Sequence, residues 1–125
     1  MLNTAVAAGL LALLAPVLAL AQAGADCKPD GNQQQLNACA VRDFQAADTR
    51  LNIRYGEVMA QLDADGRTRL RHEQREWLRR RDPGCKTEAR PNEGGSAWPL
   101  FFYGCMEKAS TERTQALAGW GRKTP

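Results

Sequence analysis

Apolar residues between Leu36 and Leu62 recur three or four positions apart, which is the spacing of one face of an α-helix. The members of this stripe are Leu36, Ala40, Phe44, Ala47, Leu51, Tyr55, Val58 and Leu62. The turn-forming residues DCKPDGN (26–32) precede the stripe, and DADG (63–66) interrupts it. We therefore predict a first helix that begins near Gln33 and ends at this break.

A second helix is expected after the break, because Asp63 or Asp65 can accept hydrogen bonds from its first free amide groups. It should run to about Arg81, since the Pro83-Gly84 pair that follows is unfavourable inside a helix.

Residues 86–95, KTEARPNEGG, are then predicted to form a polar loop before a third helix. Ser96 can cap that helix, and Pro99 is tolerated because it falls in the first turn. Its apolar members are Leu100, Phe101, Cys105, Ala109, Ala116, Leu117 and Trp120. No stretch alternates as a strand does, so we predict an all-α fold: an antiparallel helical hairpin with a third helix packed on it.

One arc of the second helix should face the core. At about 100° per residue, this arc holds Leu70, Gln74, Trp77, Leu78 and Arg81. The remaining arginines lie outside it and are expected to be solvated: Arg69, Arg71, Arg75, Arg79 and Arg80. A charge inside the arc is costly without a partner, so Arg81 should bind a carboxylate.

The hairpin register identifies that carboxylate. If the chain folds back about residue 64, position n of the second helix faces a position near 128 − n of the first. Arg81 then arrives level with Ala47 and Asp48, and we predict an interior Asp48–Arg81 ion pair that fixes the register. The other facing pairs are Trp77 with Leu51 and Leu70 with Val58.

An uncharged, apolar segment occupies residues 4–21 and is typical of a secretory signal peptide. Small residues follow it, so we expect residues 1–21 to be removed by cleavage after Ala21 or Ala23. Asp26, directly before Cys27, disfavours a lipid anchor. The mature chain, a single helical domain over residues 26–120, should be periplasmic or secreted, with no membrane span after processing.

Four cysteines suit such a small exported domain, whose core alone gives limited stability. We predict the disulfides Cys27–Cys39 and Cys85–Cys105, with Cys39–Cys85 as the rival because the hairpin brings both to one end. The cysteines form no CxxC pair and the chain has one histidine, so no metal site and no cofactor are expected. The protein should be a monomer.

The stretch HEQREWLRRRDPGC (72–85) resembles three functional motifs only in part. His72-Glu73 begins like the zinc motif H-E-x-x-H, but Glu76 stands where the second histidine is needed. An exported chain meets no genome, so nucleic acid is not an expected partner. With all cysteines paired, no nucleophile–base set can be assembled. The composition leaves catalysis by paired carboxylates open, but no motif marks such a pair. We therefore expect no catalytic residues and no enzymatic activity, and a small enzyme that acts on the cell wall is the last of the alternatives.

The net charge of +3 is unevenly distributed. Residues 26–65 hold seven acids and four bases, a balance of −3, whereas residues 66–125 hold seven acids and thirteen bases, a balance of +6. The second half can therefore attract anions.

Three stretches together resemble the LprI-like lysozyme-inhibitor family of small bacterial envelope proteins: CKPDGNQQQLNACAVRDFQAADTRLNIRYGEVMAQL, LRHEQREWLRRRDPGC and EGGSAWPLFFYGCMEKASTERTQAL. The resemblance covers Cys27 to Leu117, with all four cysteines in place. Matching positions are Leu36, Asn37, Asp48, Leu51, Asn52, Tyr55, Leu70, Gln74, Trp77, Arg81, Asp82, Gly94, Gly95, Ser96, Thr111, Arg113 and Leu117. Pro83-Gly84 and the lack of a lipid-anchor signal depart from the pattern.

The resemblance implies a binding protein for a lysozyme-type muramidase. We expect the loop 86–104, closed by Cys85 and Cys105, to enter the active-site cleft of that enzyme, with Arg90, Asn92, Ser96 and Trp98 as contacts. Because Gln74, Trp77 and Arg81 face inward on the wheel, they belong with Asp48, Leu51 and Tyr55 to a structural core.

Charge favours an alternative. Animal lysozymes are basic and would be repelled by a +3 partner at long range. The solvated arginine face of the second helix would instead bind anionic components of the cell envelope, and the protein would be a periplasmic accessory protein. Steep loss of binding with salt distinguishes this function from inhibition by a loop.

Overall fold

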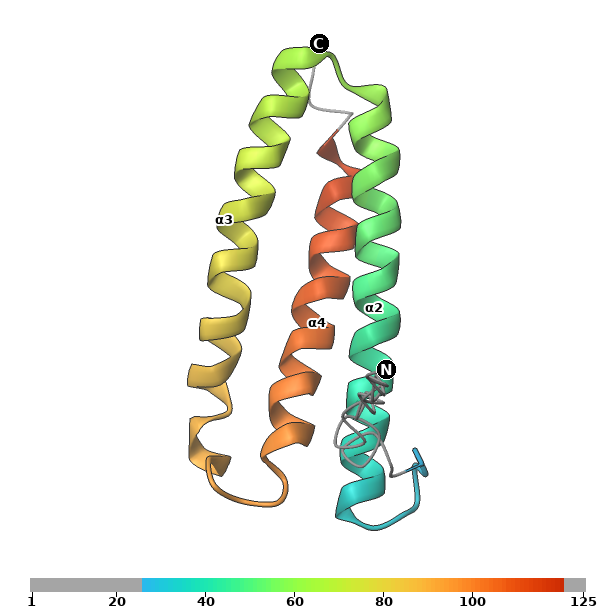
Figure 1. The fold of residues 1–125 in the computed structure, drawn as a ribbon, viewed down its shortest axis with the longest axis vertical. Coiled ribbons are helices and arrows are strands. Elements are labelled where there is room, and N and C mark those ends of the chain that lie inside the picture. The colour runs from blue at the N-terminus through green and yellow to red at the C-terminus, as the bar shows by residue number, and fades with distance from the viewer. Residues whose placement is uncertain (1–25, 121–125) are drawn as a thin grey trace, which may run out of the picture.

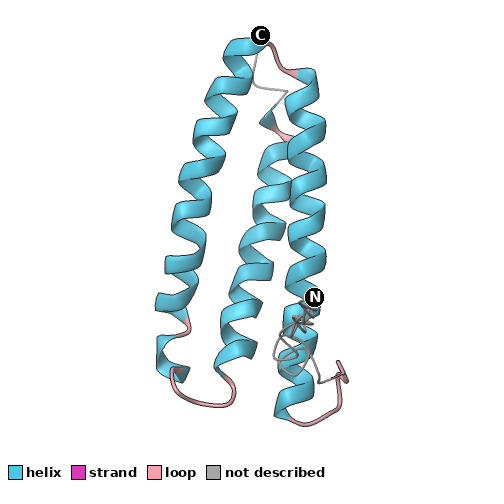
Figure 2. Cartoon of the chain, in the orientation of Figure 1, coloured by secondary structure: helices cyan, strands magenta, loops and turns pink. Residues whose placement is uncertain are grey.

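Residues 26–120 form three long α-helices in the computed structural model, which describes this part of the chain. They are α2 (Gln33–Gln61), α3 (Ala64–Glu88) and α4 (Trp98–Ala118), and the short 3₁₀ helix η1 (Arg90–Asn92) lies between the last two. The three helices lie lengthwise beside one another (Figure 1), and the described residues contain no strand (Figure 2). The predicted all-α fold, a hairpin with a third helix, is confirmed.

The expected signal peptide and its cleavage positions fall within residues 1–25, outside the described residues. Within residues 26–120, no helix combines the length and the apolar character that crossing a membrane requires.

Side-chain caps determine where the first two helices begin. Asn32 accepts a hydrogen bond from the Gln35 amide, and the Gln35 side chain accepts one from the Asn32 amide, so each satisfies a free donor of α2. Asp63, and not Asp65, caps α3 by accepting from the Gly66 amide at 2.7 Å. With α2 ending at Gln61, only Leu62 and Asp63 separate the two helices, so α3 must turn back antiparallel to α2.

The second helix is longer than predicted, because Pro83 lies inside α3 and does not end it. A proline in a helix removes one hydrogen bond and costs about 3 kcal/mol. Packing beyond it compensates: Cys85 and Ala89 are both buried, and Cys85 is bonded to Cys105 of α4. Pro83 itself is exposed, so the freed carbonyl of Arg79 can face water.

The start and the inner face of α4 also differ from prediction. Ser96 does not cap the helix, which begins at Trp98 without a side-chain cap, although Pro99 does lie in its first turn. Phe101 is exposed, and the buried positions are Phe102, Met106, Ser110 and Leu117. Because the inner face of α4 includes the polar Ser110, a search for apolar residues alone does not identify the residues of this face correctly.

Helix α4 runs in the same direction as α2 and lies close along it, whereas α3 stands farther from α2 (Figure 1). The small residues Ala40 and Ala47 of α2 and Ser110 of α4 are buried, which lets these two backbones approach. The wider space beside α3 requires long side chains.

Arg81 of α3 fills much of that space. Its guanidinium lies 5.3 Å from the ring centroids of both Phe44 and Trp77. Its nitrogens donate to Asp48 at 3.0 Å, to Asp82 at 3.0 Å and to the Ser110 hydroxyl at 3.3 Å. The side chain is 10% exposed, and the predicted Asp48–Arg81 ion pair is present.

Arg113 of α4 is a second guanidinium group that lies near the ring of Trp77. Its guanidinium lies 5.8 Å from the Trp77 ring and donates to Gln74 at 2.8 Å and to Glu73 at 2.9 Å. The Trp120 indole N–H also donates to Glu73, at 3.2 Å. Rings and guanidinium groups therefore alternate across the three helices in the order Phe44, Arg81, Trp77, Arg113. We call these four residues the ladder.

Apolar clusters lie on either side of the ladder. The cluster toward the α2–α3 turn contains both predicted facing pairs, Leu51 with Trp77 and Val58 with Leu70. The cluster toward the other end comprises Cys85, Ala89, Phe102 and Met106. Leu78 was expected to face the core, but it is 41% exposed, because the inner face of α3 is narrow and Leu78 lies on its flank.

Arg81 belongs to the ladder and Arg79 does not, so we expect replacement of these two arginines to lower the free energy of unfolding by very different amounts. Arg81→Ala should lower the free energy of unfolding by about 2–4 kcal/mol, because it leaves Asp48 and two aromatic faces without their partner. Arg79 is bound only to Glu76 on the surface. The change Arg79→Ala should therefore lower the free energy of unfolding by less than about 0.5 kcal/mol. Urea denaturation of both variants measures the difference, and equal midpoints would contradict the structural role of Arg81.

Candidate functional site

The end of the bundle opposite the α2–α3 turn gathers two connecting segments (Figure 1). Residues 26–32 precede α2 there, and residues 89–97 join α3 to α4. Each segment is next to a disulfide: Cys27–Cys39 fastens the first to α2, and Cys85–Cys105 joins α3 to α4 beside the second. Both predicted disulfides are confirmed, and the Cys39–Cys85 rival is absent. We call this region the loop end.

The loop 89–97 is tied to its surroundings at several points. The Asn37 side chain of α2 donates to the Ser96 carbonyl at 2.8 Å. The loop also contains η1 and the backbone hydrogen bonds from Glu93 to Arg90 and from Gly95 to Asn92. Gly94 has φ 78°, a conformation that glycine adopts without strain. These contacts hold the loop in one conformation.

The loop is shorter than the predicted protrusion 86–104. Residues up to Glu88 belong to α3 and residues from Trp98 belong to α4, so only 89–97 is available as a connection. The boundary moves because the inner faces of both helices extend to the disulfide that joins them.

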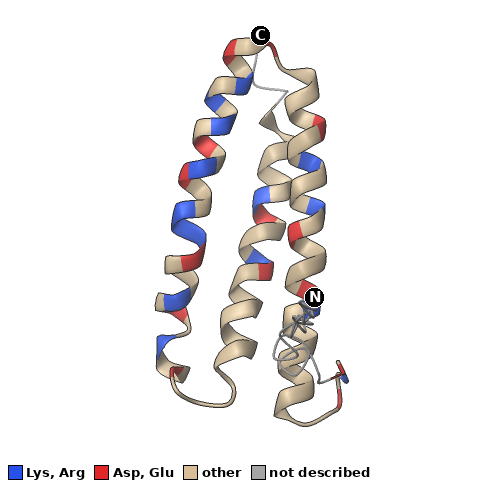
Figure 3. Ribbon diagram, in the orientation of Figure 1, with Lys and Arg blue, Asp and Glu red and all other residues tan. Residues whose placement is uncertain are grey.

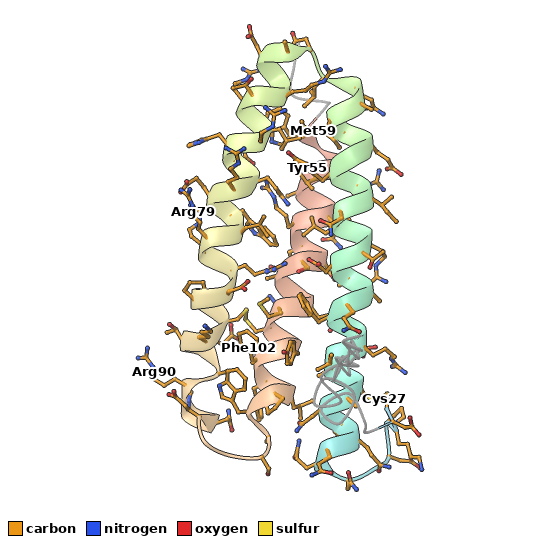
Figure 4. The ribbon with its side chains drawn as sticks, viewed as in Figure 1. Cys27, Tyr55, Met59, Arg79, Arg90 and Phe102 are labelled. Atoms are coloured by element: carbon orange, nitrogen blue, oxygen red, sulfur yellow. A yellow bond between two sulfur atoms is a disulfide. The ribbon has the colours of Figure 1, made fainter. Side chains whose placement is uncertain are left out.

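The four predicted contact residues occupy different environments. Arg90 and Ser96 are exposed, and Arg90 points away from the bundle (Figure 4). Asn92 is half-buried. Trp98 is also half-buried, and its ring stacks on Phe102 with 4.7 Å between centroids. Trp98 therefore supports the loop from inside, and only part of its surface can contact a partner.

Phe101 is an exposed aromatic residue that the sequence analysis counted among the apolar members of the third helix and did not single out as a contact. It lies in the first turn of α4 and is 50% exposed. A helical wheel started from Trp98 would have revealed it, since Trp98 and Phe102 share the inner face and Phe101 lies 100° away from Phe102. Large exposed aromatic side chains are typical anchors at protein interfaces.

The loop end differs in charge from α3. Residues 26–36 and 86–101 hold four acids and three bases, a balance of −1. Helix α3 holds five acids and eight bases, a balance of +3, and basic residues follow its outer edge (Figure 3). The basic character of the chain is therefore concentrated away from the loop end.

The loop end presents backbone, charged and aromatic groups rather than a cluster of metal ligands. Across the part of the chain that the structure describes, no three His, Cys, Asp or Glu side chains are grouped so that they could hold a metal ion, and all four cysteines are in disulfides. What the loop end offers is a fixed backbone turn, a guanidinium and an aromatic ring.

Comparisons with known proteins show the family of this chain and a solved structure of similar fold. The family model described as lysozyme inhibitor LprI matches residues 25–117. An uncharacterized protein of Rhizobium meliloti (strain 1021) is 32% identical over 105 residues, covering 74% of this chain and 76% of the relative. The crystal structure of a DUF1311 family protein from Pseudomonas putida KT2440 is similar with a TM-score of 0.66 and 28% identity, covering 73% of this chain and 95% of that one.

The two disulfides should stabilise the protein similarly but affect different segments. Replacing either pair with alanine should cost about 3 kcal/mol, because both close loops of comparable length. Loss of Cys85–Cys105 should accelerate amide hydrogen exchange in residues 89–97, whereas loss of Cys27–Cys39 should leave that loop protected. Exchange measured by mass spectrometry on both variants tests this, and equal protection of the loop would show that the Cys85–Cys105 bond does not hold it.

Proposed function

The chain belongs to the lysozyme inhibitor LprI family, and on this premise we propose that it inhibits a lysozyme-type muramidase by placing its loop end in the active-site cleft of the enzyme. The observation that carries the proposal is the fixed loop 89–97 at one end of a narrow bundle, with Arg90 and Phe101 exposed beside it. In this proposal the protein acts by binding and not by catalysis.

The fixed loop favours tight binding. A flexible loop loses conformational entropy when it becomes ordered in a complex, and this loss weakens affinity. Here the Asn37–Ser96 hydrogen bond, η1 and the nearby disulfide have already ordered the loop in the free protein. Most of the interaction energy can then appear as affinity.

The exposed groups match the chemistry of the target. Glycoside hydrolases of this kind place two carboxyl groups on either side of the scissile bond. The Arg90 guanidinium offers several donors in a planar arrangement suited to a carboxylate. Gly94 and Gly95 carry no side chain, so the loop is thin at that point and can approach the floor of a cleft. Phe101 supplies an apolar anchor at the edge.

The uneven charge permits docking to a basic enzyme. The overall charge of +3 would repel such a partner, but the loop end itself has a balance of −1. Electrostatic repulsion between exposed charges is screened over about 8 Å at physiological ionic strength. An enzyme bound at the loop end therefore meets a nearly neutral surface, while most of α3 lies farther away.

Export belongs to the same proposal. A muramidase inhibitor is useful where it meets the enzyme, so we place the mature protein in the periplasm or outside the cell, as a monomer released from the expected signal peptide. N-terminal sequencing of the exported protein tests the predicted cleavage after Ala21 or Ala23.

Inhibition should depend on the exposed residues of the loop end. Phe101→Ala and Arg90→Ala should each weaken inhibition roughly tenfold to thirtyfold, the usual range for an anchor residue at an interface. Neither change should alter the thermal midpoint by more than a degree or two, because both side chains face solvent. The measurement is lysis of a peptidoglycan suspension by a panel of lysozymes, with and without the mature protein.

Two exposed residues on α2 serve as matched controls. Ile53 is 57% exposed and is compared with Phe101, and the exposed Arg50 is compared with Arg90. Ile53→Ala and Arg50→Ala should inhibit as the unchanged protein does. Inhibition that is lost equally in all four variants would argue against the loop end, and a protein that inhibits no lysozyme at micromolar excess would refute the proposed function.

A further inference from the structure

The outer edge of α3 carries a second interaction surface. Arg71, Arg75 and Arg79 recur every four residues along α3, outside the inner face that Leu70, Gln74 and Arg81 occupy. All three are exposed, and Arg79 points away from the bundle (Figure 4). Basic residues follow this edge along much of the helix (Figure 3). We call these three residues the basic stripe.

The acids of α3 do little to neutralise this edge. Glu73 binds Arg113 and Trp120 on the inner side, and Asp82 binds Arg81. Glu76 is the one acid of α3 that pairs with the basic stripe, through Arg79. Within residues 26–120, neither Arg71 nor Arg75 has a carboxylate within 4.0 Å.

Such an arrangement destabilises the free protein. Like charges four residues apart on a helix repel one another, and the basic stripe contains two such pairs. An anion bound between two neighbouring guanidinium groups attracts both of them and offsets the repulsion between them. Loss of this repulsion makes the free energy of anion binding more favourable.

The spacing favours a chain of anions. Four residues of α-helix rise about 6 Å and turn about 40° beyond a full turn, so the arginines form a gently winding row of charges about 12 Å long. The planar guanidinium binds two oxygens of one phosphate at once. A flexible polymer with phosphates in its backbone can place successive groups along this row. The row is convex and one helix wide, and Leu78 is the one large exposed apolar residue on α3, so the helix has no apolar face for a bilayer.

From these observations we propose that the basic stripe binds a linear phosphate-bearing polymer of the cell envelope. This surface is separate from the loop end and does not depend on the proposed inhibition of a muramidase. It would hold the protein at an anionic wall while leaving the loop end free.

The proposal is tested with inorganic polyphosphate of about twenty units as the probe. By the counterion-release relation, three phosphate contacts should weaken binding roughly 20-fold when salt rises from 50 to 200 mM. The variant Arg71→Gln/Arg75→Gln/Arg79→Gln should lose at least about tenfold in affinity at low salt and most of the salt dependence. Circular dichroism should show a melting midpoint that is not lowered, since all three side chains are exposed and their removal relieves the repulsion between them.

A control with the same loss of charge separates position from net charge. Arg42→Gln/Arg50→Gln/Arg54→Gln removes three exposed arginines from α2, two of which already pair with Asp43 and Glu57. This variant should bind polyphosphate within about twofold of the unchanged protein. An equal loss in the two triple variants would overturn the proposal.

Two further probes define the ligand chemistry. Polyglutamate of similar length presents carboxylates, and vesicles containing about 30% phosphatidylglycerol present phosphates on a bilayer. Both should bind at least about tenfold more weakly than polyphosphate. Tighter binding to vesicles would assign the stripe to a membrane, and equal binding to polyglutamate would reduce it to general charge attraction. The triple stripe variant should still inhibit lysozyme, so failure of one proposal leaves the other intact.

Discussion

The stacking of the Arg81 guanidinium between the rings of Phe44 and Trp77 is the interaction on which the bundle depends. Because small residues bring α2 and α4 close together, α3 must be held at a greater distance by a side chain that is long, flat and able to donate in several directions. Arginine has all three properties, whereas a lysine ammonium can neither stack nor bind several partners in one plane. Its bonds to Asp48 of α2 and Ser110 of α4 meet at one level, so this single residue fixes the register of all three helices.

The same interaction explains why many of the positions that match the family pattern lie inside the bundle. Of the positions that match the family pattern, Asp48, Trp77, Arg81 and Arg113 belong to the ladder or bind it, and the cysteines secure the two connecting segments at the loop end. These residues specify a scaffold. Arg90 and Phe101, which the scaffold exposes, lie outside the pattern, so the resemblance specifies the fold and does not specify these exposed side chains.

The features predicted most reliably from the sequence are those that depend on a pattern repeated over many residues, such as the apolar stripe of a helix. The stripe of α2 faces inward as expected, and the Asp48–Arg81 pair followed from a register argument that needs only helix geometry. The end of α3 could not be predicted locally, because burial of Cys85 and Ala89 outweighs the cost of Pro83, and that burial depends on α4. The inner face of α4 was misplaced because Ser110 and Arg113 are buried by contacts with other helices. An apolar pattern does not detect polar residues on an inner helix face, so the apolar members predicted for this helix included the exposed Phe101 and omitted Ser110 and Arg113.

The interior and the surface of α3 are electrostatically linked. Buried Arg81 and Arg113 hold Asp82 and Glu73, so these acids are unavailable to neutralise the outer edge, and the basic stripe is in part a consequence of the ladder. Distance then separates the two surfaces. Arg75 lies about 20 Å along α3 from the last residue of that helix, Glu88, at 1.5 Å per residue, and Arg90 follows beyond it. This separation exceeds two screening lengths at physiological salt. A basic enzyme at the loop end therefore feels little repulsion from the centre of the stripe, and an anionic polymer on the stripe does not obstruct the loop. One small bundle can thus carry two surfaces of different charge, because ion pairs made by the core arginines bind acids that would otherwise neutralise the outer edge of α3.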